Sequence, residues 1–202
     1  MKMPYSVSSK KRTSPSKVAR DAFNVYDPDI RRQSLAQLSS APFGGEEPYV
    51  RMYRMLLDDR DPTVRAVCLK ALGDHGSVED AQKMIPFLED EVAFVRWEAA
   101  KALKKVHWPS AVNPLIKTLR EDEDVDVRMT TAAALGQYAQ VSVFQALVGA
   151  LDDRNFGVVN AARNSLKTLT GQDYGTDGVW WLTWADNHRG KLFEQQQAYY
   201  WQ

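Results

Sequence analysis

The stretch that decides the fold is DPTVRAVCLKALGD, at residues 61–74. Its apolar residues recur every three or four positions, which predicts a helix with one buried face. Three features are unusual for such a helix: arginine stands inside the apolar run, alanine occupies positions where a core normally takes a larger side chain, and glycine follows the last leucine. The rest of the chain explains them, because the pattern is repeated.

Related stretches are DIRRQSLAQL at 29–38, FVRWEAAKAL at 94–103, DVRMTTAAAL at 126–135 and GVVNAARNSL at 157–166. We call the first apolar position of each unit its anchor; a leucine follows eight residues later. The anchors are Ile30, Val64, Val95, Val127 and Val158, which lie 34, 31, 32 and 31 residues apart. A period in this range is typical of a solenoid of stacked helical hairpins.

Each unit predicts two helices, because a second apolar-periodic segment precedes every anchor segment. The expected pairs are 15–25 and 28–39, 47–57 and 62–74, 78–89 and 93–107, 110–120 and 125–139, and 141–151 and 155–170. Alanines seven residues after the anchors (Ala71, Ala102 and Ala134) should let neighbouring second helices approach closely. The predicted fold class is therefore all-α, an α-solenoid of about five helical hairpins.

The segments LLDDRDPTVRAVCLKAL, FLEDEVAFVRWEAAKAL and LREDEDVDVRMTTAAAL resemble HEAT repeats, and the resemblance covers about residues 15–170. The HEAT signature places aspartate after the first helix and arginine early in the second. Here these residues are Asp59 and Arg65, Asp90 and Arg96, and Asp122 and Arg128. The resemblance implies a right-handed superhelix in which these side chains form a hydrogen-bonded ladder between units, a structural role. The signature is incomplete at both ends, with Val25 in place of aspartate and Val159 in place of arginine.

Composition divides the chain into four expected regions. Residues 1–14 form a basic N-terminal tail that should be disordered, because the first twenty residues hold six lysines and arginines and no acid. Residues 15–170 form the solenoid. Residues 171–188, rich in tryptophan, should cap its last hairpin; the stretch TGQDYG with the tryptophans after it resembles the closing element of bacterial HEAT-repeat proteins. Residues 189–202 should form an extended aromatic tail, too short for a sixth hairpin.

The sequence offers no recognisable catalytic constellation. Cys68 is the only cysteine, and it falls on a core position. The three histidines (His75, His107 and His188) are far apart and match no metal-binding motif. The sequence therefore predicts a non-enzymatic protein without a cofactor or metal. An enzyme related to the HEAT-like alkylpurine DNA glycosylases or bilin lyases is the weakest alternative.

The resemblance also implies that the second helices line the inner curve of the solenoid, where a partner would bind. The candidate partner-binding residues on this face are Lys70, Trp97, Lys101, Lys104, Lys105, Met129, Asn160, Asn164 and Lys167. They predict a basic surface with an exposed aromatic anchor. We expect the partner to be another protein; a nucleic acid held by the lysines and the basic tail is the alternative.

The aromatic tail is a second candidate contact. Phe193, Tyr199, Tyr200 and Trp201 follow the cap, and the polar run EQQQ separates the last three from it. Exposed aromatic side chains usually have a partner, so these residues should dock on the solenoid, on a second copy or on another protein.

The sequence predicts neither a membrane span nor a signal peptide. No apolar run approaches the ~18 residues that a spanning helix needs, and no apolar region follows the basic start. We therefore expect a cytoplasmic protein.

Overall fold

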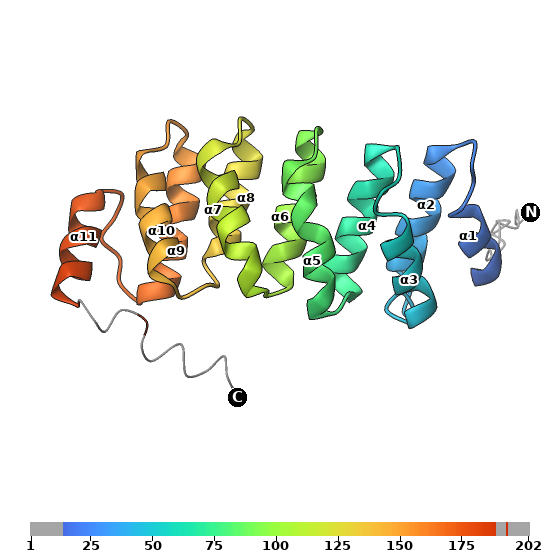
Figure 1. The fold of residues 1–202 in the computed structure, drawn as a ribbon, viewed down its shortest axis with the longest axis horizontal. Helices are drawn as coiled ribbons and strands as arrows, with labels where there is room; N and C mark the ends of the chain where they lie inside the picture. The colour runs from blue at the N-terminus through green and yellow to red at the C-terminus, as the bar shows by residue number, and fades with distance from the viewer. Residues whose placement is uncertain (1–13, 189–192, 194–202) are drawn as a thin grey trace, which may run out of the picture.

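The computed structural model describes residues 14–188 and residue 193 and arranges them as a row of helices that runs from α1 to α11 (Figure 1). The expectations for residues 1–13, 189–192 and 194–202 lie outside this part of the chain. Within it the secondary structure is helical, without strands, so the predicted all-α solenoid is confirmed. None of the described helices has the length and apolarity that crossing a membrane would need.

The helices form two layers, which correspond to the first and second helices of the repeats. The first layer contains α1 (Pro15–Asp21), α3 (Glu47–Met55), α5 (Ala81–Met84), α7 (Val112–Glu121) and α9 (Val141–Gly149). The second layer contains α2 (Pro28–Ser39), α4 (Pro62–His75), α6 (Ala93–Lys105), α8 (Val125–Leu135) and α10 (Phe156–Thr170). A final helix, α11 (Gly178–Asn187), packs on α9.

Short polar side chains start most of the second helices. Asp27, Asp61, Asp124 and Asn155 each accept a hydrogen bond from a backbone N–H group of the first turn. Such caps satisfy donors that have no partner inside the helix. The turn residues therefore fix where each second helix begins.

The first helix of the third unit is interrupted. The predicted helix over 78–89 consists of a 3₁₀ turn η1 (Val78–Asp80), the four-residue α5 and a second 3₁₀ segment η2 (Ile85–Glu89). Pro86 accounts for the break, because proline lacks the N–H that would continue the α-helix and its ring clashes with a carbonyl one turn earlier. Shorter 3₁₀ turns flank the first helices of the next two units: η3 (Pro109–Ala111) and η4 (Ala150–Asp152).

The first unit is less complete than its sequence suggests. Helix α1 ends at Asp21, before the predicted end at residue 25, and the Asn24 side chain instead accepts hydrogen bonds from the next turn. Phe23 is consequently exposed. The Ile30 anchor is 37% exposed, whereas the other four anchors are fully buried.

Close approach between second helices explains the small residues of the repeat. A Cβ atom added at Gly73 on α4 would lie 2.9 Å from the Cα atom of Ala102 on α6. At Gly136, which follows α8, an added Cβ would lie 2.9 Å from the Cβ atom of Ser165 on α10. Glycine and alanine thus set the spacing of the second layer, because larger side chains would force these helices apart.

Helix α8 also ends early, at Leu135 instead of the predicted residue 139. The residues that follow α8 make contacts with the preceding unit. Gln137 Nε2 donates to the Leu103 carbonyl at the end of α6, and the buried Tyr138 hydroxyl accepts from the Trp108 amide. The chain leaves the helix where its side chains bind the preceding unit.

Candidate functional site

Four arginines on the second helices join each unit to the next. Each uses Nε and Nη2 to hold both oxygens of one aspartate, at 2.7–3.1 Å: Arg31 binds Asp59, Arg65 binds Asp90, Arg96 binds Asp122 and Arg128 binds Asp153. The remaining Nη1 donates to a carbonyl oxygen in the turn that precedes the arginine's own helix. Every guanidinium therefore contacts two successive units.

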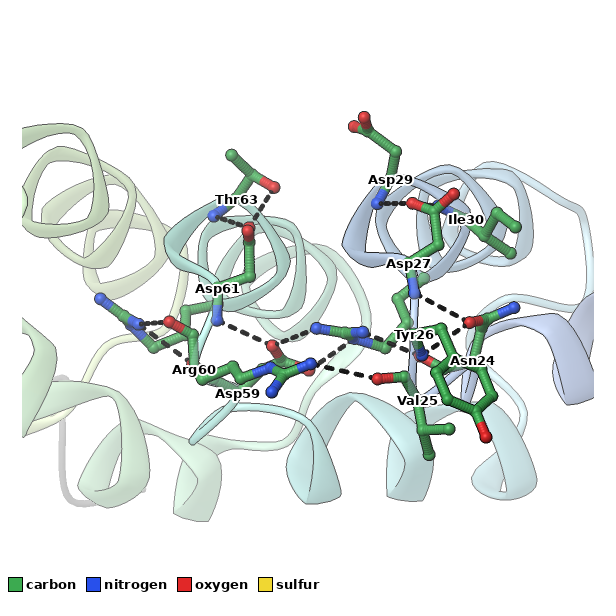
Figure 2. Close-up of polar contacts among 12 residues, drawn as sticks. Asn24, Val25, Tyr26, Asp27, Asp29, Ile30, Asp59, Arg60, Asp61 and Thr63 are labelled. Atoms are coloured by element: carbon green, nitrogen blue, oxygen red, sulfur yellow. Dashed lines mark hydrogen bonds and ion pairs between the residues drawn. The ribbon is translucent and has the colours of Figure 1, made fainter.

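The first of these junctions shows how the turns are coupled (Figure 2). Asp59 also accepts a hydrogen bond from the Asp61 amide, and Asp61 caps α4 through the Thr63 amide and hydroxyl. Arg60 reaches back to the Val25 carbonyl of the preceding unit, at 3.1 Å. The ion pair is thus embedded in a hydrogen-bonded network formed by two turns.

The network favours the charged forms of its four arginines and of Asp153. The hydrogen bonds and charge of the aspartates raise the pKa values of the four arginines. The hydrogen bond from Arg128 lowers the pKa of Asp153. Since the guanidinium groups are occupied and nearly buried, they are unsuited to binding a substrate.

The side chains that could carry covalent or acid–base chemistry are engaged elsewhere. Cys68 is completely buried, and this burial raises the pKa of its thiol. His75 Nε2 lies 2.7 Å from the Ser39 carbonyl oxygen, and His188 Nδ1 lies 2.7 Å from the Trp184 carbonyl oxygen. His107 stacks on the Tyr138 ring with 4.4 Å between centroids. Across residues 14–188 and 193, no three potential ligands gather in a way that could hold a metal ion.

We use the term second-helix face for the solvent-exposed side of α4, α6, α8 and α10. It carries the nine candidate partner-binding residues that the sequence analysis names, from Lys70 on α4 to Lys167 on α10. Its lysines are less available than the sequence suggests. Lys101 pairs with Glu98 at 2.9 Å, Lys167 lies 3.4 Å from Asp173, and Lys105 pairs with Asp74. The ion pairs therefore neutralise part of the positive charge of this face, and Asp173 is shared with Arg163.

Trp97 is half-buried on this face, not the exposed anchor expected from the sequence. The Lys101 ammonium lies 3.8 Å from the centroid of its ring. A cation at this distance is attracted to the ring face. The long lysine side chain thus accounts for the partial burial of the tryptophan.

One groove of about 550 Å³ lies on the second-helix face, between α8 and α10. It brings together four of the predicted residues, Lys104, Met129, Asn160 and Asn164. Lys104 has no ion-pair partner among the described residues, and the Asn160 and Asn164 carboxamides have no hydrogen-bond partner there. Lys70, Trp97, Lys101, Lys105 and Lys167 lie outside the groove lining.

Small residues open this groove, and the sequence analysis did not single them out. They are Ala133, Gly136, Gly157 and Ala161. At the position of Lys101 in the third unit, the last two units carry Ala133 and Asn164, and at the position of Phe94 they carry Asp126 and Gly157. This local loss of side-chain volume along the exposed helix face is the signal that could have located the groove.

The C-terminal region packs on the last hairpin. Trp181 is completely buried, donates to the Gly175 carbonyl at 3.0 Å and meets the Tyr174 ring edge-on. Trp184 packs 6.0 Å from Phe144 on α9. Phe193 belongs to the same cluster: it is buried and its ring lies 6.5 Å from Phe144. Tyr199, Tyr200 and Trp201 lie outside the described residues.

The sequence profile of HEAT repeats matches residues 19–104 and 88–167 of this chain. Among curated proteins, none has a sequence that matches it. Solved structures with a similar fold include an engineered protein, 19% identical, which covers 90% of each chain with a TM-score of 0.61.

Two designed armadillo repeat proteins are also similar. One is 18% identical, with 88% of this chain and 89% of that chain covered and a TM-score of 0.61. The other, in complex with the peptide (KR)4, is 18% identical, with 92% of this chain and 96% of that chain covered and a TM-score of 0.58. At these identities the likeness shows the fold alone.

Proposed function

Because the chain belongs to the HEAT-repeat family, we propose that it is a non-enzymatic scaffold or adaptor that binds a segment of another protein on its second-helix face. The observation that carries the proposal is the groove between α8 and α10, whose lining offers free polar groups on rigid helices. A binding surface of this kind differs from the ladder, where each guanidinium nitrogen already has a hydrogen-bond partner.

The chemistry of the groove suits an extended polypeptide. Asn160 and Asn164 are one helical turn apart, and each carboxamide both donates and accepts hydrogen bonds, as a peptide backbone requires. Met129 supplies an adaptable apolar contact, and Lys104 supplies a positive charge for a carboxylate. The designed armadillo repeat protein of similar fold that is in complex with the peptide (KR)4 supports the choice of a peptide segment as partner.

The test compares the wild-type protein with an Asn160→Ala, Asn164→Ala double variant. Each protein is used to capture partners from native lysate, and a partner identified by mass spectrometry is then purified and titrated calorimetrically. We expect the double variant to weaken binding about tenfold or more, because both carboxamides are lost. The matched control is Gln145→Ala, an exposed carboxamide on α9, which should bind as the wild type does. Equal affinity of all three proteins would refute the proposed site.

Nucleic-acid binding through Lys70, Lys101, Lys104, Lys105 and Lys167 is the alternative proposal. The ion pairs on the second-helix face count against it, since a phosphate backbone favours uncompensated positive charge. Filter binding at low salt decides the matter: retention of duplex or single-stranded DNA or RNA would support it. If no nucleic acid is retained, the nucleic-acid proposal is refuted and protein binding remains. The third alternative is an enzyme. A glycosylase would release an alkylated base from DNA, and a lyase would form a covalent bilin adduct.

We also propose that the aromatic tail contributes to self-association or partner capture. Phe193 is anchored in its own solenoid, which leaves Tyr199, Tyr200 and Trp201 as the candidate contacts. Deleting residues 194–202 retains Phe193 and should reduce association, measured by sedimentation velocity, while the main melting transition stays nearly unchanged. Unchanged association and partner capture would exclude a role for these aromatics.

A further inference from the structure

A second groove lies in the first-helix layer, on the other side of the solenoid from the second-helix face. It has a volume of about 520 Å³ and runs between η2 and α7, in the third and fourth units. Figure 1 shows these units at the middle of the row. Its origin lies in the sequence: Pro86 converts the end of one first helix to a 3₁₀ segment, which is thinner than an α-helix.

The lining of this first-helix groove is apolar on one side and acidic at the rim. Ile85, Pro86 and Pro114 supply apolar surface, and Ile85 packs on the hydrophobic core behind it. Glu89 and Glu121 stand at the helix ends that border the groove. The groove therefore combines a contact for apolar side chains with negative charge beside it.

Only part of this negative charge is neutralised. Lys117 crosses from α7 to Glu89 at 2.6 Å, but both side chains are more than half exposed, so the pair is weak. Glu121 makes no ion pair with any described residue. The neighbouring turns add further exposed acids, among them Glu91, Glu123 and Asp126. The edge of the third and fourth units thus carries a cluster of exposed acidic side chains.

We propose that the first-helix groove is a second docking site, and that it binds a protein segment in which apolar residues stand next to lysine or arginine. Charge complementarity with the acidic rim selects such a segment, and the apolar lining supplies the contact area. The site shares no lining residue with the groove between α8 and α10. The chain can therefore hold two segments of opposite charge preference at once, which is the geometry that an adaptor needs.

The test uses three fluorescein-labelled octapeptides and the full-length protein, with binding followed by fluorescence anisotropy. The peptides alternate lysine with leucine, glutamate with leucine, and lysine with serine. We expect saturable binding of the lysine–leucine peptide and about tenfold weaker binding of the lysine–serine peptide. Any binding of the glutamate–leucine peptide should take place in the groove between α8 and α10, so it should not compete with the lysine–leucine peptide.

Matched variants locate the site. Glu121→Lys should weaken binding of the lysine–leucine peptide about tenfold, whereas Asp152→Lys, at the equivalent position of the last unit but outside the groove, should change it less than about twofold. Lys117→Glu removes the cation at the rim and should strengthen binding, so the proposal remains testable if Glu121→Lys fails to fold.

Three results would overturn the proposal. The first is an equal loss of affinity in Glu121→Lys and Asp152→Lys, which would indicate diffuse charge attraction. The second is displacement of the lysine–leucine peptide by the glutamate–leucine peptide. The third is absence of lysine–leucine binding at about millimolar peptide. Because the variants of this groove leave Asn160 and Asn164 intact, failure here is distinguishable from failure of the proposed second-helix site.

Discussion

Replacing Arg65 with methionine should destabilise the solenoid strongly, although the new side chain has a similar length. Arg65 is about one tenth exposed and binds both oxygens of Asp90, at 2.8 and 2.9 Å. It also donates to the Asp59 and Arg60 carbonyls, at 3.0 and 3.2 Å. The variant leaves the Asp90 carboxylate buried without its cation. Removing one partner of a buried ion pair typically costs about 3–5 kcal/mol, and we expect a loss of that size.

The assay is equilibrium unfolding in urea, followed by far-UV circular dichroism. The control is Arg163→Met, which removes a bidentate pair of the same geometry with Asp173 at an exposed site. Exposed pairs contribute at most about 1 kcal/mol, so this variant should remain close to wild type. An Arg65→Met, Asp90→Leu double variant should recover part of the lost stability, because neither charge is then left alone.

The reasoning is refuted if Arg65→Met costs no more than Arg163→Met. It is also refuted if the double variant is less stable than Arg65→Met by the full cost of a second independent substitution. Either result would mean that the junctions between units are held by apolar packing, with the ladder contributing little.

Three further changes test the packing and electrostatics. Gly73→Ala should destabilise the protein by about 1–3 kcal/mol in urea unfolding, because the added Cβ would press on α6. Gly149→Ala is the control: its added Cβ meets no neighbouring residue within 4 Å, so it should stabilise the protein by about 0.5–1 kcal/mol. Equal effects of the two substitutions would contradict the close approach of α4 and α6. Arg163→Met should raise the pKa of Asp173 from about 2 toward its ordinary value of 3.8, as measured by carboxyl NMR titration, because the guanidinium stabilises the charged form; an unchanged pKa would exclude the pair. Trp181→Ala should lower the free energy of unfolding by about 3–5 kcal/mol, and a loss below about 1 kcal/mol would show that α11 does not cover the core.

The repeat made most of the fold predictable. Val64, Val95, Val127 and Val158 are completely buried, as their spacing requires, because stacking leaves only one face of each second helix accessible to water. The interruption by Pro86 was readable in principle, since proline inside a helical pattern breaks it. Periodicity alone predicts one helix over 78–89, because the apolar spacing continues through Pro86.

The direction of the ladder was less predictable. The resemblance implies a ladder between units but does not say which aspartate each arginine binds; in the structure Asp59 binds Arg31 of the preceding unit. The guanidinium reaches forward to the next turn, so the end units each contribute a member: Arg31 at the start and Asp153 at the end. The sequence alone does not state this offset of one unit, which depends on how neighbouring hairpins stack.

The ion pairs of the second-helix face were only partly predictable. Counting lysines along the helices predicted a basic surface, yet Asp74 lies beside Lys105 and Asp173 beside Lys167. Asp74 precedes Lys105 by 31 residues, one repeat period, so this pair was open to prediction. Asp173 lies in the loop after α10, where no periodicity applies and only the folded chain brings it to the helix.

The most direct test of the central claim is hydrogen–deuterium exchange of the protein with and without a purified partner identified by the capture experiment. If a partner segment lies in the groove on the second-helix face, amides in residues 129–137 and 157–168 should exchange more slowly in the complex, as should the end of α6 near Lys104. Protection confined to the first-helix layer or to the turns, with these segments unchanged, would contradict the claim that this face is where the scaffold binds its partner.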